Sequence, residues 1–431
     1  MVDFRGVRLQ AFFLLMTASA TLADESQFGH NMLQHFTLDP LYTNLNHGSY
    51  GATPKIVQES AQQFRLLTES NPDQFYRFDV FNYLDAARDK LSSVVGVDSE
   101  DLVIIPNASE GMNAILRGVV TSAASAIVYL DLEYFMCAET MRFLRDTLGA
   151  TLYEVDTDEF LPATDANTFN TGLVSAVKTV LGEIPDDQKI VCSFSHITSM
   201  PAIILPVVEL GEVCHEAGGI VVIDGAHVLG NIPLNIPSTG ADVYVSNGHK
   251  WSYTSKGSAF LWVSKALQPT TNPYTPGRIQ PVIISNEGAG ENPYATLFSW
   301  EGTKDYGAFL SMPAALTFRA IFGESAIMQY TNTLAAEGGA LLARAWGTQM
   351  LVPSTLLSSM VNVEVPANTS TCTPSLSEAL LDEYKTYVPV TVKSGRCWVR
   401  ISAQIYTELS DFQYVADSMT ALLTKLASND L

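Results

Sequence analysis

Hydrophobic positions along the chain form two alternating kinds of segment, short apolar runs and longer amphipathic stretches. The short runs are rich in β-branched residues and predict strands at 102–106, 126–130, 189–193, 219–223, 241–245 and 258–262. Amphipathic stretches predict helices at 57–66, 83–95, 112–120 and 207–217. Because nearly continuous apolar strands separated by helices are typical of a sheet covered on both faces, we expect an α/β fold with a mainly parallel sheet.

The pattern changes near residue 311. A long helix is predicted at 312–322 and continuing to 343, followed by loops that contain Pro and Ser, short strands and a final helix at 411–426. This pattern predicts a smaller α+β C-terminal domain at 311–431 after a large domain at 61–310. Residues 24–60 form an N-terminal segment that we expect to line the functional site.

The first 23 residues have the layout of a secretory signal. Arg5 and Arg8 precede an apolar run at 11–20, and small residues precede Asp24 in the manner of a cleavage site. The run is shorter than the ~20 apolar residues that cross a bilayer. We therefore expect a signal peptide at 1–23 and a protein of the secretory pathway, with no membrane span. A cytoplasmic enzyme with an apolar extension, or an organelle presequence, is the alternative.

Composition narrows the class of protein. The chain has 431 residues, is 47% hydrophobic and 16% charged, and carries a net charge of −21. These values exclude a small disulfide scaffold, a disordered polyanion and a histone-like cation. Because no basic cluster is present, we expect neither nucleic acid nor an anionic membrane surface as a partner. An anionic ligand must therefore be held by a local site.

The five cysteines are scattered and odd in number, without a CxxC motif. Zinc sites and disulfide frameworks require more regular spacing. We therefore expect no metal site and interpret most of the cysteines as small buried hydrophobic residues.

Two predicted strands end beside residues with ionisable or reactive side chains. Asp224 ends the run 219–223 and is followed by glycine, and Lys250 follows the next strand, 26 residues later, between His249 and Trp251. Alone, the carboxylate would more often cap a helix and the lysine would more often lie on the surface. Because the carboxyl ends of parallel strands meet at one edge of a sheet, however, the amine and the carboxylate can face one pocket.

Two further turns follow predicted strands. The turn Asn107–Gly111 offers a hydroxyl and backbone amides that could hold a phosphate at the start of a helix, although capping is its more common role. Tyr134 places an aromatic ring after the strand at 126–130, a position that usually belongs to the core or its rim.

Together, these segments suit pyridoxal phosphate (PLP). A lysine forms a Schiff base with this cofactor, a carboxylate keeps its ring nitrogen protonated, an aromatic ring stacks on it, and a helix terminus holds its phosphate. A buried lysine also has the lowered pKa that a nucleophile requires.

From about Phe28 to Leu426 the chain resembles the class V, fold-type I PLP-dependent enzymes. The resemblance rests on five segments: Phe28–His30, Leu45–Gly51, Ser195–Ser199, Asp224–Gly230 (DGAHxxG) and His249–Trp251 (HKW). They are most similar to the branch that contains isopenicillin N epimerase-like proteins and fungal hercynylcysteine sulfoxide lyases, with a loline-pathway enzyme nearby. The resemblance implies that the large domain at 61–310 binds the cofactor.

The resemblance also implies a role for each matching residue. Lys250 carries the Schiff base, Asp224 pairs with the pyridine nitrogen, His227 lies near the phenolic oxygen, and Tyr134 stacks on the ring. The other implied cofactor-binding residues are Ser109, Glu110, Gly111, Ser199, Asn247, His249 and Thr303.

Thr303 matches a segment that reaches the phosphate of a neighbouring subunit, which implies a homodimer. Arg400 matches the arginine that binds the α-carboxylate of the substrate, a task that suits a bidentate guanidinium. Asn46 and His47 are expected to line the mouth of the site as substrate-binding residues. Arg396 is a second candidate for the carboxylate, although a solvated side chain is the simpler interpretation.

The expected activity is that of a PLP-dependent enzyme that forms a Cα carbanion from a small amino-acid substrate. We favour a carbon–sulfur lyase acting by β-elimination on a cysteine conjugate or its sulfoxide. An amino-acid epimerase or aminotransferase of class V is the alternative, and a catalytically silent secreted binding protein is the alternative of another class. Desulfuration through a protein persulfide is disfavoured because the surroundings of Cys372 do not match the loop of cysteine desulfurases.

Overall fold

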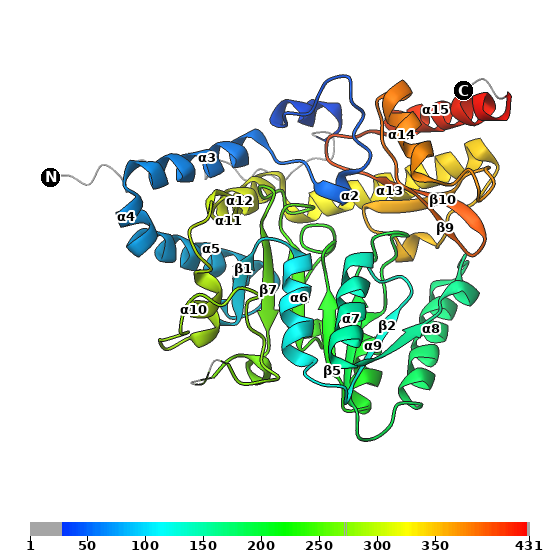
Figure 1. Ribbon diagram of the computed structural model, residues 1–431. Helices are drawn as coiled ribbons and strands as arrows, with labels where there is room; N and C mark the ends of the chain where they lie inside the picture. Colours follow the sequence, from blue (N-terminus) through cyan, green and yellow to red (C-terminus); the bar gives the residue numbers. More distant parts are fainter. Residues whose placement is uncertain (1–27, 271, 273, 429–431) are drawn as a thin grey trace.

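A seven-stranded sheet organises the larger part of the computed structural model, which describes residues 28–270, 272 and 274–428 (Figure 1). Its order is β1-β7-β6-β5-β4-β2-β3, and β7 runs antiparallel to β1 and β6 while β2 to β6 run parallel. The strands are β1 (Leu102–Ile105), β2 (Ser125–Leu130), β3 (Thr151–Val155), β4 (Lys189–Ser195), β5 (Ile220–Asp224), β6 (Val243–Asn247) and β7 (Ala259–Val263). The predicted mainly parallel α/β sheet is confirmed, and β3 is an additional edge strand.

Helices cover both faces of this sheet. On one face lie α6 (Ala108–Val119) and α7 (Phe135–Leu148), and on the other lie α8 (Ala166–Leu181) and α9 (Val207–Glu216). Successive residues of β2 enter the two cores alternately, Ile127 packing with α6 and α7, and Val128 with α8 and α9. This two-sided burial explains why the strands read as continuous apolar runs.

The N-terminal region contributes η2 (His30–His35), α2 (His47–Tyr50), α3 (Lys55–Ser70), α4 (Pro72–Gln74), η3 (Phe75–Asp79) and α5 (Val80–Val95). The predicted helices at 57–66 and 83–95 are thus confirmed and longer than expected. Val57, Ala61 and Phe64 form the buried face of α3, at the spacing of one helical stripe. The predicted signal at 1–23 lies outside the described residues, and within them no helix is long and apolar enough to cross a membrane.

A second, three-stranded sheet forms the smaller unit. β8 (Met360–Glu364) and β9 (Val390–Lys393) flank β10 (Arg396–Ser402), both antiparallel to it. The unit's helices are α13 (Glu324–Trp346), α14 (Pro374–Tyr384) and α15 (Leu409–Ser428). The single helix predicted from 312 to 343 is wrong in one respect, because α12 (Met312–Phe322) ends at Gly323, whose φ of 84° lies outside the helical range.

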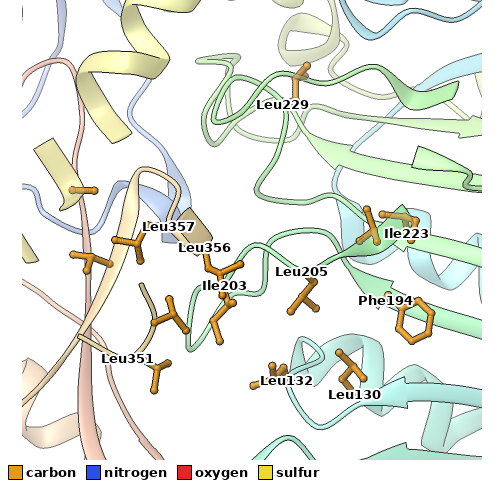
Figure 2. Packing of buried hydrophobic residues seen from close by; sticks show 14 of the residues in the cluster. Leu130, Leu132, Phe194, Ile203, Leu205, Ile223, Leu229, Leu351, Leu356 and Leu357 are labelled. Atoms are coloured by element: carbon orange, nitrogen blue, oxygen red, sulfur yellow. The ribbon is translucent and has the colours of Figure 1, made fainter. Parts of the chain in front are cut away.

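One hydrophobic cluster connects the two sheets. Figure 2 shows Ile203 and Leu205 between side chains at the ends of the large sheet and those of the smaller unit. The strand-end residues are Leu130, Phe194 and Ile223, and those of the smaller unit are Leu351, Leu356 and Leu357. This shared core positions β10 relative to the carboxyl ends of the large sheet.

The cysteines correct one expectation. All five are buried as predicted, but Cys192 is disulfide-bonded to Cys214 and Cys372 to Cys397, with Cα–Cα distances of 6.4 and 5.6 Å. Cys137 is the free thiol among the described cysteines. The bonded cysteines are 22 and 25 residues apart in the sequence. They meet because α9 packs on β4 and a loop packs on β10, so the spacing alone did not indicate a disulfide.

Candidate active site

The carboxyl ends of β4, β5 and β6 place the chemical groups at one edge of the sheet. Asp224 is the last residue of β5 and pairs with Ser195 across the ladder, and Asn247 is the last residue of β6. Lys250 follows Asn247 by three residues. The pocket that they share is lined by Ala108, Ser109, Tyr134, Cys137, Ser195, Ile197, Ser199, Asp224, Ala226, His227, Asn247 and Lys250.

The amine of Lys250 lies in this pocket, 3.0 Å from Nε2 of His227. Burial lowers its pKa to about 7, and the positive charge of Arg400 acts in the same direction, while Asp224 opposes them. The amine is therefore neutral in a larger fraction of molecules near pH 7 than that of an ordinary lysine, as an attacking nucleophile must be.

The carboxylate of Asp224 is buried and incompletely satisfied. Its Oδ1 accepts a hydrogen bond of 2.8 Å from the amide of Ala226, whereas the donor to Oδ2 is the thiol of Cys137 at 3.5 Å. Burial raises the pKa of Asp224. Because a thiol is a weak donor, a protonated pyridine nitrogen is a better partner for Oδ2 and would lower that pKa again.

The half-buried Glu133 supplies a second carboxyl group here, to which sequence reasoning assigned no role. Its Oε1 accepts hydrogen bonds from the amide of Tyr134 at 2.9 Å and the hydroxyl of Ser195 at 3.0 Å. Burial and the charge of Asp224 raise the pKa of Glu133 to about 8. Glu133 and Asp224 therefore titrate as a coupled pair, in which the charge of one disfavours the charge of the other. One clue in the sequence could have pointed to Glu133: it lies in the same segment after a strand as Tyr134.

Tyr134 begins α7 as its N-terminal cap residue and lines the pocket. Burial raises the pKa of its hydroxyl, so the phenol is neutral. Cys137 lies one helical turn further and is almost fully buried, which raises the pKa of its thiol well above the usual value. The ring and the thiol therefore form an uncharged wall beside Asp224.

At the start of α6, some of the predicted phosphate-binding residues line the pocket and others do not. Ser109 and Asn247 line the pocket, and Oδ1 of Asn247 accepts from the amide of Ala108 at 2.9 Å. The amides of Glu110 and Gly111 instead donate to the side chain and the carbonyl of Asn107. Glu110 and Gly111 therefore stand behind the pocket wall as part of the helix cap.

The carboxyl group of Glu110 faces another carboxyl group, that of Glu301. Burial and the charge of Glu301 raise the pKa of Glu110 to about 7. This environment disfavours a phosphate contact by the Glu110 side chain.

His249 points one ring nitrogen into the protein. Its Nδ1 donates to the carbonyl of Ser258 at 3.0 Å, and burial lowers its pKa to about 4. In the neutral ring Nε2 carries no proton, so His249 can donate to a phosphate only when the phosphate charge raises that pKa.

Arg400 extends from β10 and is 2% exposed. One terminal nitrogen donates to the carbonyl of Ser199 at 2.8 Å and lies 3.3 Å from its hydroxyl. The other donates to Oδ1 of Asn46 at 2.9 Å and to the hydroxyl of Ser49 at 2.7 Å. All these partners are neutral, and Nε has no partner among the described residues. Burial lowers the pKa of Arg400 to about 10, which still leaves a cation that lacks an anion.

Arg396 has a different environment on the same strand. Its side chain is 47% exposed and forms an ion pair with Glu364 at 3.0 Å. This surface ion pair agrees with the interpretation of Arg396 as a solvated side chain.

His47 lies beneath the lysine turn, and its predicted place at the mouth is wrong. It is 1% exposed, its Nε2 donates to the carbonyl of Lys250 at 2.9 Å, and its Nδ1 lies 2.9 Å from the hydroxyl of Tyr406. Burial lowers the pKa of His47 to about 3, so the ring is neutral. With both nitrogens occupied, His47 supports the backbone that carries Lys250.

A buried arginine, Arg319 on α12, joins the two catalytic turns. Its terminal nitrogens donate to the carbonyls of Trp251 at 2.6 Å and of Gly230 at 2.8 Å, and its Nε donates to Glu324 at 2.7 Å. A Cβ on Gly230 would lie 2.7 Å from the Trp251 carbonyl, so this close approach requires glycine. Sequence reasoning missed Arg319 because nothing nearby in the chain marks it.

The sequence model of the family described as aminotransferase class-V matches residues 51–415. The chain belongs to the class-V aminotransferase family. PLP is therefore the cofactor of this protein. The pocket suits it, since it offers the amine of Lys250, whose pKa is lowered, and the buried carboxylate of Asp224, whose Oδ2 has only a thiol as donor.

Several curated relatives span nearly the whole chain of this class-V protein. The L-cysteine desulfhydrase-like protein lolT1 of Epichloe uncinata is 28% identical and covers 94% of this chain and 98% of its own. The hercynylcysteine sulfoxide lyase of Schizosaccharomyces pombe is 26% identical, with coverage of 92% and 98%. The isopenicillin N epimerase of Streptomyces clavuligerus is 28% identical, with coverage of 89% and 96%.

Solved structures confirm the fold. The apo cysteine desulfurase of Thermococcus onnurineus NA1 has a TM-score of 0.71 and 17% identity, covering 92% of this chain and 98% of its own. A complex of the cystine C-S lyase C-DES with cysteine persulfide has a TM-score of 0.70 at 17% identity, with coverage of 90% and 98%. At this identity they show the fold alone, which is fold-type I.

Thr303, like Glu110, Gly111 and His249, is not part of the described pocket wall. It is exposed and follows Gly302. Its predicted contact belongs to a neighbouring subunit and stays a prediction.

Proposed function

We propose that this class-V protein is a PLP-dependent carbon–sulfur lyase that acts on a cysteine conjugate or its sulfoxide. The observation that carries the proposal is a half-buried Lys250, whose pKa is lowered, together with a buried Arg400 that has no anionic partner and acts on that pKa. The curated names of relatives, a desulfhydrase-like protein and a sulfoxide lyase, support the choice of leaving group.

Arg400 would bind the substrate α-carboxylate. Its Nε is free of partners, and its neutral partners Asn46, Ser49 and Ser199 fix the guanidinium plane. This arrangement leaves the Nε–H group to donate a charge-assisted hydrogen bond to a carboxylate. The amino acid is thereby oriented with its Cα toward Lys250.

Lys250 would move the proton. When bound, PLP supplies an electron-withdrawing ring that stabilises negative charge at the substrate Cα. Asp224 would hold the ring nitrogen in its protonated form, and Tyr134 would cover one face of the ring. His227 lies beside the amine, 3.0 Å away, where it would contact the phenolic oxygen.

The overall reaction balances as a β-elimination. The Cα proton passes to the Lys250 amine, and the Cβ–S bond breaks with its electron pair leaving on sulfur. The resulting 2-aminoacrylate takes up water to give pyruvate and ammonia. No oxidant or reductant is required.

The cysteines favour elimination over transfer of sulfur to the protein. A persulfide mechanism requires an accessible thiolate, but Cys372 is disulfide-bonded to Cys397. Cys137, the free thiol of the described chain, is buried and has a strongly raised pKa. The sulfur fragment would therefore leave as a small molecule.

The decisive experiment offers cysteine S-conjugates and their sulfoxides to the holoenzyme and identifies the products. We expect equal amounts of pyruvate and ammonia together with the sulfur fragment. Lys250→Ala should abolish turnover, whereas Arg396→Met should retain it. Exclusively inverted or transaminated products would instead support the epimerase or aminotransferase alternative. A purified protein without visible cofactor absorbance would support the silent binding protein.

The homodimer is part of the proposal. Thr303 is exposed, and Val282, Ile283 and Ile284, in the region that precedes it, expose between 41% and 53% of their surface. An exposed apolar segment of this kind suits a contact between protein chains. Light scattering should give twice the mass of the chain, and Thr303→Arg should weaken cofactor retention if the loop reaches a neighbouring phosphate.

We also propose that the protein enters the secretory pathway. The N-terminal segment has the layout of a signal, and two disulfides are typical of proteins that fold in an oxidising compartment. N-terminal sequencing of the protein from its natural source should start near Asp24. A start at Met1 or Val2 would contradict secretion.

A further inference from the structure

Trp251 follows the catalytic lysine and contacts the histidine that faces it. The indole nitrogen of Trp251 donates to Nδ1 of His227 over 3.4 Å, while Nε2 of His227 lies 3.0 Å from the amine of Lys250. Both rings are 2% exposed. Each ring nitrogen of His227 therefore has one defined neighbour.

The indole decides which nitrogen of His227 carries the proton. An indole N–H is a donor and never an acceptor, so Nδ1 must present its lone pair to it. Burial and the nearby charges of Lys250, Arg400 and His249 keep the imidazole neutral. A neutral ring with an unprotonated Nδ1 has its proton on Nε2.

The structure holds Trp251 firmly enough for this role. Its carbonyl accepts from Arg319 at 2.6 Å, and its ring lies 5.1 Å from the ring of His47. A Cβ on Gly48 would approach the indole to 3.2 Å, so a larger residue there would press on the ring. The indole therefore has little freedom to turn its N–H elsewhere.

We propose that Trp251 is a positioning residue that fixes His227 in the Nε2–H tautomer. His227 then acts as a hydrogen-bond donor toward the Lys250 nitrogen and toward the phenolic oxygen of the cofactor. It cannot accept a proton at Nε2, which excludes it as the general base at that atom. The donation from His227 to the phenolic oxygen of PLP rests on the proposed function. The tautomer of His227 does not depend on that function.

The tautomer can be measured without cofactor. In protein labelled with ¹⁵N-histidine and freed of PLP, long-range nitrogen–proton correlation distinguishes a protonated from an unprotonated ring nitrogen. The chain has seven histidines, and loss of one signal set in His227→Gln assigns the resonances. We expect the wild-type His227 to show a protonated Nε2 and an unprotonated Nδ1 at pH 8. A protonated Nδ1 would overturn the proposal.

Trp251→Phe removes the donor while keeping an aromatic ring. His227 should then show both tautomers or the Nδ1–H form. Trp346→Phe is the matched control, because Trp346 is also buried and its indole donates to the carbonyl of Ala416 at 3.2 Å. This control should leave the His227 signals unchanged. An unaltered tautomer in Trp251→Phe would overturn the proposal, and if that variant fails to fold, the wild-type measurement still decides.

A second readout uses the holoenzyme. The visible absorbance of bound PLP changes with pH as the proton between the lysine nitrogen and the ring oxygen is lost. Without a donor from His227 that oxygen holds the proton more tightly, so the midpoint should rise by about one pH unit in Trp251→Phe and stay constant in Trp346→Phe. An unchanged midpoint in Trp251→Phe would overturn the donor role. Failure of the wild type to bind PLP through Lys250 would instead contradict the proposed function and leave the tautomer intact.

Discussion

At the scale of single residues, the site combines two buried cations whose charges act on each other. Arg400 lowers the pKa of Lys250, and all of Arg400's own partners are neutral. Because Arg400 has no anionic hydrogen-bond partner of its own, its burial has an electrostatic cost that a bound carboxylate relieves. The same arrangement therefore favours substrate and keeps the lysine reactive.

Replacement of Arg400 tests this coupling. Arg400→Met should weaken amino-acid binding by about 10- to 100-fold, because a hydrogen bond to a charged group contributes roughly 1.5–3 kcal/mol. PLP affinity should change far less. Arg396→Met, on the same strand but half exposed, should leave both affinities nearly unchanged. Equal substrate affinity in Arg400→Met, measured by spectral titration, would remove this residue from the site.

The pH dependence of Lys250 gives a second test. Its pKa of about 7 means that the amine is protonated and unreactive at lower pH and becomes neutral as the pH rises through 7. In PLP-free protein, reductive methylation of Lys250 should therefore follow a midpoint near pH 7, well below the ~10.4 of an ordinary lysine. In Arg400→Met the midpoint should move upward. Peptide mapping of the labelled protein measures both, and a wild-type midpoint near 10 would contradict the buried amine.

At the scale of elements, sequence reasoning succeeded where a periodic pattern and a strand end coincide. Asp224 and Lys250 were predicted to face one pocket because parallel strands share an edge, and both line the same pocket beyond β5 and β6. Groups that act from distant parts of the chain had no such signal. Arg319 is one, since its contacts with Trp251 and Gly230 depend on how α12 packs.

Arg319 gives a prediction at this scale. Arg319→Met leaves two buried carbonyls without a donor and should lower the free energy of unfolding by about 3 kcal/mol. Glu324→Gln alters only the 40%-exposed partner of the same arginine and should cost less than about 1 kcal/mol. Denaturant unfolding of the two variants measures both values. Similar stabilities would show that the contacts between the catalytic turns contribute little.

At the scale of the whole molecule, each of the two units contains one disulfide. Cys192–Cys214 ties α9 to β4 in the large unit, and Cys372–Cys397 ties a loop to β10 in the smaller one. Neither could be predicted from spacing, because a disulfide depends on three-dimensional proximity of the two Cα atoms. Denatured, unreduced protein should therefore titrate one thiol, and reduced protein five.

The Cys372–Cys397 bridge lies close in sequence to Arg400, and removing it tests whether it supports stability, the position of Arg400, or both. Cys397 lies three residues before Arg400 on β10, yet this strand is paired with β8 on one side and β9 on the other. Cys372→Ser with Cys397→Ser should therefore lower the free energy of unfolding by about 3 kcal/mol, as expected for a loop of this length. Activity per folded molecule should remain close to that of the wild type, because the two ladders still hold Arg400. A large rise in KM at unchanged stability would show instead that the bridge, rather than the sheet, positions the guanidinium.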